Sequence, residues 1–97
     1  MDVSFEWDQR KNRENIKKHG ISFSEAMTVF DDPNIQYKSD PDHSQQEEER
    51  FLVLGFSERM RILVVCHCYY DADSVIRLIS ARKANRLETN SYGGGIL

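Results

Sequence analysis

Three apolar runs in the second half of the chain constrain its fold most. Residues Phe51–Phe56, Arg61–Tyr70 and Val75–Ile79 are mostly aliphatic or aromatic, and only short polar links separate them. Runs of this length joined by tight turns are typical of an antiparallel β-meander. Side chains alternate between the two faces of a strand, so the middle run divides into two sets. One set holds Ile62, Val64, Cys66 and Cys68, and the other holds Leu63, Val65, His67 and Tyr69.

The first half of the chain predicts a short strand followed by two helices. Val3–Trp7 has the composition of a strand, and Asp8 can cap a helix over Gln9–His19 that Gly20 ends. The side of this helix with the best spacing for burial is mainly polar, and it consists of Asn12, Asn15, Ile16 and His19. A face of this kind is either a packing compromise or part of a binding groove.

The second helix has a clearer apolar stripe. Ser22 and Glu25 form a capping-box pattern at its start, and Pro33 ends it because proline disfavours helix in the preceding residue. The stripe consists of Phe23, Ala26, Met27 and Phe30. A possible strand at Asn34–Lys38 follows, and then a polar, acidic loop over Ser39–Glu49.

The last apolar run is predicted to lead directly into a helix. Ser80 can cap a helix that starts at about Ala81 and ends near Tyr92. Arg82 and Arg86 are four residues apart, so they would project from one side of that helix. This arrangement predicts an anion-binding site at the junction of strand and helix.

Taken together, the pattern predicts one α+β domain over residues 1–92, with the element order of about β-α-α-β-β-β-β-α. Two N-terminal helices and a C-terminal helix are expected to pack on an antiparallel sheet. A length of 97 residues agrees with one domain and a single modest core. The glycine-rich residues 93–97 are expected to form a flexible tail.

Charge is distributed unevenly along the chain. The net charge is −3, with 12 acidic and 6 basic residues in positions 1–49 but 4 and 7 in positions 50–97. An acidic balance disfavours non-specific nucleic-acid binding, although a local arginine cluster is compatible with a polyanion at one site. No apolar run reaches the length of a membrane span, and the N-terminus lacks a signal-peptide pattern. We therefore expect a cytoplasmic protein without membrane contact and with reduced cysteines.

The motifs disfavour metal and nucleophilic chemistry. Cys66 and Cys68 are expected to point away from His67 on their strand, and no CxxC or HExxH spacing occurs. No G-x-S-x-G turn occurs either, and thiols in an apolar strand tend to have a raised pKa. We expect no metal and no cofactor.

The basic residues favour phosphate chemistry instead. RNA is cut without metal when its own 2′-hydroxyl attacks the adjacent phosphate, which requires proton transfer and cations that stabilise the phosphorane. Arginine suits the second task because its planar fork stays charged and can engage two phosphate oxygens. The arginines available are Arg50, Arg61, Arg77, Arg82 and Arg86, and the candidates for proton transfer or further phosphate contacts are Lys18, His19 and His67. Each also has an ordinary explanation, such as a solvated strand end, an ion pair of Arg77 with Glu6, or a buried strand histidine.

Six short motifs, spread over nearly the whole chain, carry a family resemblance. They are Phe5–Asp8, Asn15–Gly20, the pattern from Phe23 to Pro33, Glu49–Phe51, Arg61–Val65 and Ile76–Arg82. In their order and spacing the chain resembles BrnT, the toxin family of one class of bacterial type II toxin–antitoxin pairs. The resemblance implies a RelE-like fold and a ribonuclease that cleaves RNA and thereby inhibits translation and growth.

The resemblance also implies partners and site residues. The partner is expected to be a BrnA-like ribbon-helix-helix antitoxin in a 2:2 complex that represses its own operon, so that operator DNA is bound only through the antitoxin. The residues expected at the catalytic site are Arg61, Arg77, Arg82 and, for proton transfer, His67. The residues expected to contact RNA are Lys18, His19, Arg50 and Arg86.

A second hypothesis belongs to a different class of function. The same arginine-rich face could belong to a non-catalytic interaction module that docks an acidic partner or antitoxin segment. Substitution of Arg82 separates the two hypotheses, because only the enzyme predicts that RNA cleavage slows while the protein stays folded.

Overall fold

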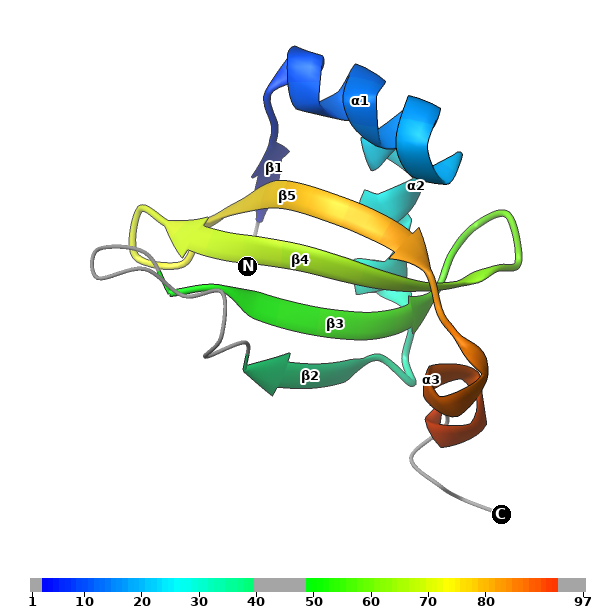
Figure 1. Ribbon diagram of the computed structural model, residues 1–97. Helices are drawn as coiled ribbons and strands as arrows, with labels where there is room; N and C mark the ends of the chain where they lie inside the picture. Colours follow the sequence, from blue (N-terminus) through cyan, green and yellow to red (C-terminus); the bar gives the residue numbers. More distant parts are fainter. Residues whose placement is uncertain (1–2, 40–48, 93–97) are drawn as a thin grey trace.

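A five-stranded sheet forms the centre of the computed structural model, which describes residues 3–39 and 49–92 (Figure 1). In space the strands follow the order β1-β5-β4-β3-β2. The elements along the chain are β1 (Ser4–Glu6), α1 (Gln9–His19), α2 (Phe23–Ala26), the 3₁₀ helix η1 (Met27–Asp31), β2 (Gln36–Ser39), β3 (Phe51–Phe56), β4 (Ile62–Tyr70), β5 (Val75–Lys83) and α3 (Arg86–Ser91).

The predicted meander is confirmed, but the sheet as a whole is mixed and not antiparallel. Strands β2, β3, β4 and β5 pair antiparallel in sequence order. Strand β1 is parallel to β5, with Phe5 opposite Ile76. A parallel neighbour requires a crossover connection, and the helices together with the other strands provide it. The prediction of an antiparallel sheet was therefore wrong for the first strand.

Helix α1 has the ends predicted for it. The Asp8 carboxylate accepts hydrogen bonds from the backbone N–H groups of Arg10 and Lys11, at 2.7 and 3.2 Å. Gly20 ends the helix in the left-handed region at φ 73°, and its N–H donates to the Ile16 carbonyl at 2.8 Å. The predicted inner face was only partly right, because the Ile16 side chain is 44% exposed.

The second helix is shorter than its apolar stripe predicts. The Ser22 hydroxyl caps α2 through the N–H of Glu25 at 3.0 Å, as expected, but the Glu25 carboxylate binds Arg61 and Ser57 in place of the reciprocal bond of the predicted capping box. After Ala26 the chain tightens into η1, so Met27 and Phe30 belong to a 3₁₀ helix. Both elements pack on one face of the sheet and cover the core, which contains Ile21, Phe23, Val29, Val53, Leu63, Val65, Leu78 and Ala81. We call this the helix-covered face.

The predicted junction at Ser80 was wrong. Ser80 does not cap a helix, because β5 continues to Lys83 and pairs there with the nine-residue strand β4. Helix α3 begins only at Arg86, with Asn85 as its cap and Glu88 completing a capping box. Arg82 therefore lies on a strand, and it does not share a helix side with Arg86 as predicted. Strand pairing outweighed the local signal of the serine.

A bulge in β5 determines which of its side chains share a face. Ser80 lies opposite Cys66, but the next residue of β4, His67, lies opposite Leu78, so Ile79 has no partner residue across the ladder. An uninterrupted strand would put Arg77 and Arg82 on opposite faces, because they are five residues apart. The bulge brings both to the same face, where Arg77 lies opposite Cys68 and Arg82 opposite Val64.

Two predictions concern segments outside the described residues. The polar loop prediction falls largely on residues 40–48, and the flexible tail prediction falls on residues 93–97. Within the part of the chain that the structure describes, no helix is long and apolar enough to cross a membrane.

Candidate active site

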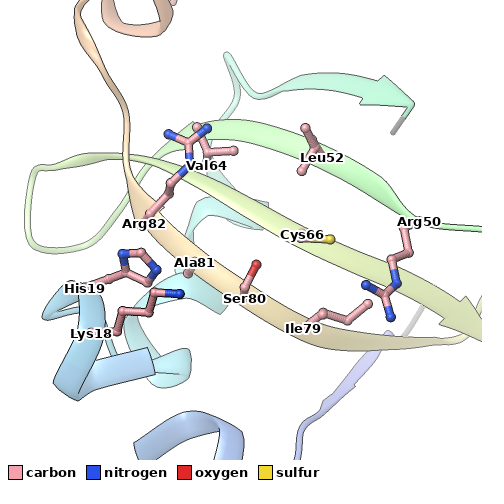
Figure 2. A pocket seen from close by; sticks show the side chains of 10 residues that line it. All are labelled: Lys18, His19, Arg50, Leu52, Val64, Cys66, Ile79, Ser80, Ala81 and Arg82. Atoms are coloured by element: carbon pink, nitrogen blue, oxygen red, sulfur yellow. The ribbon is translucent and has the colours of Figure 1, made fainter. Parts of the chain in front are cut away.

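The face of the sheet opposite the helix-covered face contains a cleft with a cationic rim (Figure 2). We call this the open face, and it carries Leu52, Val64, Cys66, Ser80 and Arg82. The cleft has a volume of about 370 Å³. Four basic side chains line it, from the end of α1, the start of β3 and strand β5. They are Lys18, His19, Arg50 and Arg82. We call it the open-face cleft.

Asn15 fixes the end of α1 that carries Lys18 and His19 against β5. Its amide nitrogen donates to the carbonyls of Ile21 and Ala81, both at 2.8 Å. Its amide oxygen accepts from the Ala81 N–H at 3.1 Å. Asn15 is buried, so these three bonds satisfy groups that water does not reach. The last turn of α1 is therefore held beside Ser80 and Arg82, and its basic residues also suit the negative end of the helix dipole.

Arg82 is engaged by a carboxylate from α3. Its two terminal nitrogens donate to the two oxygens of Glu88, each at 2.8 Å. The hydrogen bonds from Arg82 lower the pKa of Glu88 to about 2, although burial acts in the opposite direction. The same bonds raise the pKa of Arg82. Glu88 is thus ionised throughout the physiological pH range.

Comparison with known proteins decides the family. The family described as "Ribonuclease toxin, BrnT, of type II toxin-antitoxin system" matches residues 7–88 of this chain. The chain belongs to the BrnT family. It is therefore an endoribonuclease toxin, with RNA as its substrate and an antitoxin as its partner.

A solved member of the BrnT family has a similar fold. The crystal structure of the Brucella abortus ribonuclease toxin BrnT superposes with a TM-score of 0.59 and 23% sequence identity. The match covers 89% of this chain and 99% of the Brucella chain. The comparison with curated proteins found no match.

In this BrnT toxin the predicted proton-transfer residue His67 lies away from the cleft. It is fully buried on the helix-covered face, with its ring edge-to-face with Phe30 at 5.0 Å. Its Nε2 atom is 3.1 Å from the Tyr69 hydroxyl. Burial lowers the pKa of His67 to about 4, so its ring is neutral at pH 7. The open-face cleft and His67 are on opposite sides of β4.

Arg61 also lies on the helix-covered side of the toxin. Its guanidinium forms an ion pair with Glu25 of α2, with Nε donating to one carboxylate oxygen at 2.9 Å and a terminal nitrogen bound to the other. The Ser57 hydroxyl donates to the same carboxylate at 2.7 Å. The Glu25 side chain is 3% exposed, and these bonds lower its pKa although burial alone would raise it. This network ties α2 to the turn between β3 and β4.

The remaining predicted arginines lie outside the cleft lining. Arg77 shares the open face but forms an ion pair with Glu6 at 2.6 Å. This pair is the non-catalytic explanation that the sequence offered for Arg77. Arg86 is exposed in the first turn of α3. The structure thus brings together Lys18, His19, Arg50 and Arg82, and it separates them from Arg61, His67, Arg77 and Arg86.

The sequence did not predict the roles of two residues that bind to strand β5 beside the cleft, Asn15 and Glu88. Asn15 was placed on a weak helix face, and its role as a hydrogen-bonding link to β5 has no local signal. Glu88 could have been found, because Asn85 followed three residues later by Glu88 is a capping-box pattern. That pattern would have moved the helix start from Ala81 to Arg86.

Proposed function

We propose that this toxin cleaves RNA in the open-face cleft without a metal ion. The observation that carries the proposal is the convergence of Lys18, Arg50 and Arg82 on one cleft of about 370 Å³. Side chains that carry a permanent positive charge suit a phosphate and its more highly charged transition state. Metal independence is supported by the chemistry of this rim, because Lys18, Arg50 and Arg82 supply the positive charge that a metal ion would otherwise bring to the phosphate.

His19 is proposed as the proton-transfer group in place of the predicted His67. The 2′-oxygen forms a bond to phosphorus as its proton passes to the His19 imidazole, and the bond to the 5′-oxygen breaks as that oxygen takes a proton from solvent water. The products are a 2′,3′-cyclic phosphate and a 5′-hydroxyl. His19 is half-buried at the cleft, next to Lys18, whereas His67 faces the core. A histidine suits this role because its ordinary pKa lies near neutrality.

The proposed biological setting follows the family resemblance. We infer a RelE-like fold, action in the cytoplasm that inhibits translation and growth, and a BrnA-like ribbon-helix-helix antitoxin in a 2:2 complex. Operator DNA is proposed to be bound only by the antitoxin. The toxin's net charge of −3 supports this division, because proteins that bind DNA directly are usually basic.

The proposal is tested by incubating antitoxin-free toxin with end-labelled RNA in the presence of EDTA. Fragments with 2′,3′-cyclic phosphate and 5′-hydroxyl ends are the expected products. Cleavage that requires Mg²⁺, or fragments with 3′-hydroxyl ends, would contradict the proposed mechanism. A parallel reaction on translating ribosomes shows whether cleavage requires them.

Arg82→Ala tests the proposed site directly. Loss of a group that stabilises transition-state charge costs about 3 kcal/mol, so the cleavage rate should fall by roughly two orders of magnitude. Arg59→Ala is the matched control, because Arg59 is exposed on the turn between β3 and β4 and does not line the cleft. Circular dichroism and thermal unfolding verify that both variants are folded. An unchanged rate for folded Arg82→Ala would remove Arg82 from the site.

One observation favours the alternative of a non-catalytic docking surface. Arg82 already binds a carboxylate, Glu88, so the cleft accepts the side chain that an acidic partner segment would offer. The two functions separate in the RNA experiment, because a docking surface predicts no cleavage of free RNA and none on ribosomes.

A further inference from the structure

Helix α3 is attached to the rest of the protein by polar contacts and one ring contact, without buried side chains. It has six residues, Arg86–Ser91, and none of them is buried. At its C-terminal end the Tyr92 hydroxyl donates to the Asp32 carboxylate at 2.6 Å, and the Tyr92 ring stacks on Phe56 at 6.4 Å. Gln36 adds one bond to the Ser91 carbonyl at 2.9 Å. An element without buried side chains opens at low free-energy cost compared with the core.

The middle of α3 is joined to the cleft through Glu88. Both of its oxygens accept from Arg82, and one of them also accepts from the Asn85 N–H at 2.8 Å. Arg82 donates in addition to the Lys83 carbonyl at 3.2 Å. The two terminal nitrogens of Arg82 are therefore occupied at the positions where a phosphate would form its bidentate contact.

Glu88 holds Arg82 toward the α3 side of the cleft. Figure 2 shows the Arg82 guanidinium beside Val64, whereas Lys18 lies across β5 and Arg50 lies toward the other end of the strands. Glu88 itself lines a hollow of about 80 Å³ that adjoins the cleft, because both are bounded by Leu52 and Val64. A phosphate could replace the Glu88 carboxylate at the Arg82 guanidinium. Arg82 would then have an anionic partner before and after the exchange, and only Glu88 would have to move.

We propose that Glu88 competes with the RNA phosphate for Arg82, so that α3 acts as a displaceable arm that restrains the nuclease. This inference rests on the proposed function, because it assigns regulation to the same cleft. RNA binding releases Glu88, and any change that weakens the arm increases the affinity for RNA. The opposite possibility is that Glu88 orients Arg82 for the substrate, in which case its removal weakens binding.

Glu88→Gln tests the competition. Glutamine keeps a side-chain oxygen for the Asn85 N–H and for the capping box, but it removes the charge that binds Arg82. The probe is a fluorescein-labelled 2′-O-methyl oligonucleotide, which the toxin cannot cut because the nucleophilic hydroxyl is blocked. Its Kd, measured by fluorescence anisotropy, should fall at least about fivefold, since a charge-assisted pair is roughly twice as strong as a neutral one. The kcat/KM for the all-RNA substrate should rise in parallel.

Glu58→Gln is the matched control, because it makes the same change of charge at an exposed position outside the cleft. Its Kd should change less than about twofold, which measures the general effect of one charge. Equal effects of the two substitutions would overturn the proposal. Weaker binding by Glu88→Gln would overturn it too, and would make Glu88 a positioning residue.

Arg82→Ala separates failure of this inference from failure of the proposed function. If Arg82 contacts RNA, Arg82→Ala raises the Kd. In the Arg82→Ala background, Glu88→Gln should then change the Kd no more than Glu58→Gln does, because Glu88 has no arginine left to compete for. An unchanged Kd for Arg82→Ala would refute the placement of RNA at this arginine. A raised Kd together with no gain from Glu88→Gln alone would refute only the competition.

Tyr92→Phe provides an independent test of the arm. It removes the hydrogen bond to Asp32 but leaves the cleft untouched, because neither residue lines it. The Kd should fall in the same direction as for Glu88→Gln, by about twofold, since one hydrogen bond to a charged group is lost from the anchor. A Kd unchanged within error would show that α3 does not need to move.

Discussion

The two faces of the sheet use charged side chains in opposite ways. On the helix-covered face, Glu25 of α2 pairs with Arg61, and the Glu25 side chain is almost entirely shielded from water, whereas that of Arg61 is 28% exposed. On the open face, Arg82 and Glu88 also form a pair with two hydrogen bonds, but both side chains reach solvent, with 42% and 23% of their surface exposed. A carboxylate that is shielded from water, such as Glu25, cannot lose its partner without a large desolvation cost, whereas a partly exposed carboxylate can exchange it. The covered pair therefore serves structure and the exposed pair is available for function.

The histidines differ in the same way. His67 is fully buried among aromatic rings, and its pKa is lowered to about 4. His19 is half-buried at the edge of the open-face cleft. The contrast shows that the side of the sheet on which a histidine lies, more than its residue type, determines whether it can reach the cleft.

The largest effect that tests the difference between the two faces is expected on the free energy of unfolding. Arg61→Ala leaves the Glu25 carboxylate buried without its cation, and loss of one partner of such a pair costs about 4 kcal/mol. The free energy of unfolding should fall by that amount in urea denaturation, and cleavage by the folded protein should be unchanged. This outcome would remove Arg61 from the predicted catalytic set.

The control for Arg61 replaces both partners. A Glu25→Met and Arg61→Met double variant removes both charges and should recover most of the lost stability, since apolar pairs replace buried ion pairs at little cost. A stable but inactive Arg61→Ala variant would reverse the assignment and return Arg61 to the active site.

The next effect is a dependence of stability on pH caused by His67. Its pKa is about 4 in the folded protein and about 6.5 when unfolded, so the unfolded state binds a proton first as the pH falls. The contribution is fully present above pH 6.5 and is lost progressively as the pH falls, and at pH 4 the loss of stability reaches about 3 kcal/mol. Urea denaturation at several pH values measures it, and His67→Leu should flatten the slope over this window.

The same variant tests the predicted role of His67 in proton transfer. His67→Leu should cleave RNA at pH 7 within about threefold of the wild-type rate, because the ring lies on the face away from the cleft. A folded variant with its activity lost would contradict this, and an unchanged pH slope would contradict the assignment of the titration.

A smaller effect is expected on RNA affinity from the other cations of the open-face cleft. Lys18→Ala and Arg50→Ala should each weaken binding of the 2′-O-methyl probe by about threefold to tenfold. Each should also reduce the slope of log K against log salt by about 0.7, the value for one phosphate contact on a single strand. Thermal unfolding should be little changed. A loss of affinity without a change in salt slope would show that these residues do not contact phosphate.

The smallest effect is expected for the arginine of the open face that lies outside the cleft. Arg77 is paired with Glu6, whose side chain is 46% exposed, so the pair contributes at most about 1 kcal/mol to stability. Arg77→Ala should change RNA cleavage by less than about threefold, because Arg77 does not line the cleft. A larger loss of activity in kinetic assays would extend the substrate path along β5 toward β1.

Local signals were sufficient for much of the fold. Asp8, Gly20 and Ser22 are capping residues whose effect is confined to adjacent turns, and all three act as predicted. The alternation of β4 was also right, with Cys66 on the open face and His67 on the other. Such features follow from neighbouring residues alone, so the sequence contains the information they require.

The errors arose where distant residues decide the conformation. Ser80 is a good helix cap by itself, but pairing with Cys66 of β4 keeps it in a strand. The bulge at Ile79 determines which arginines share a face, and nothing near it in the sequence announces it. The sequence therefore predicts which residue types form the candidate site. It does not predict which of the candidate arginines and histidines lie together at the cleft, because that depends on the pairing of distant strands.

The bond pattern of Asn15 has a consequence for the behaviour of the toxin at high concentration. A sheet edge with unpaired N–H and C=O groups is a template on which another chain can add a strand and begin to aggregate. β1 covers β5 only as far as Arg77, so the edge beyond it would be open. Asn15 presents both a donor and an acceptor to Ala81 and so occupies that edge as a neighbouring strand would. One amide side chain thus takes up the pairing groups of Ala81, so that another chain cannot add a strand across this residue.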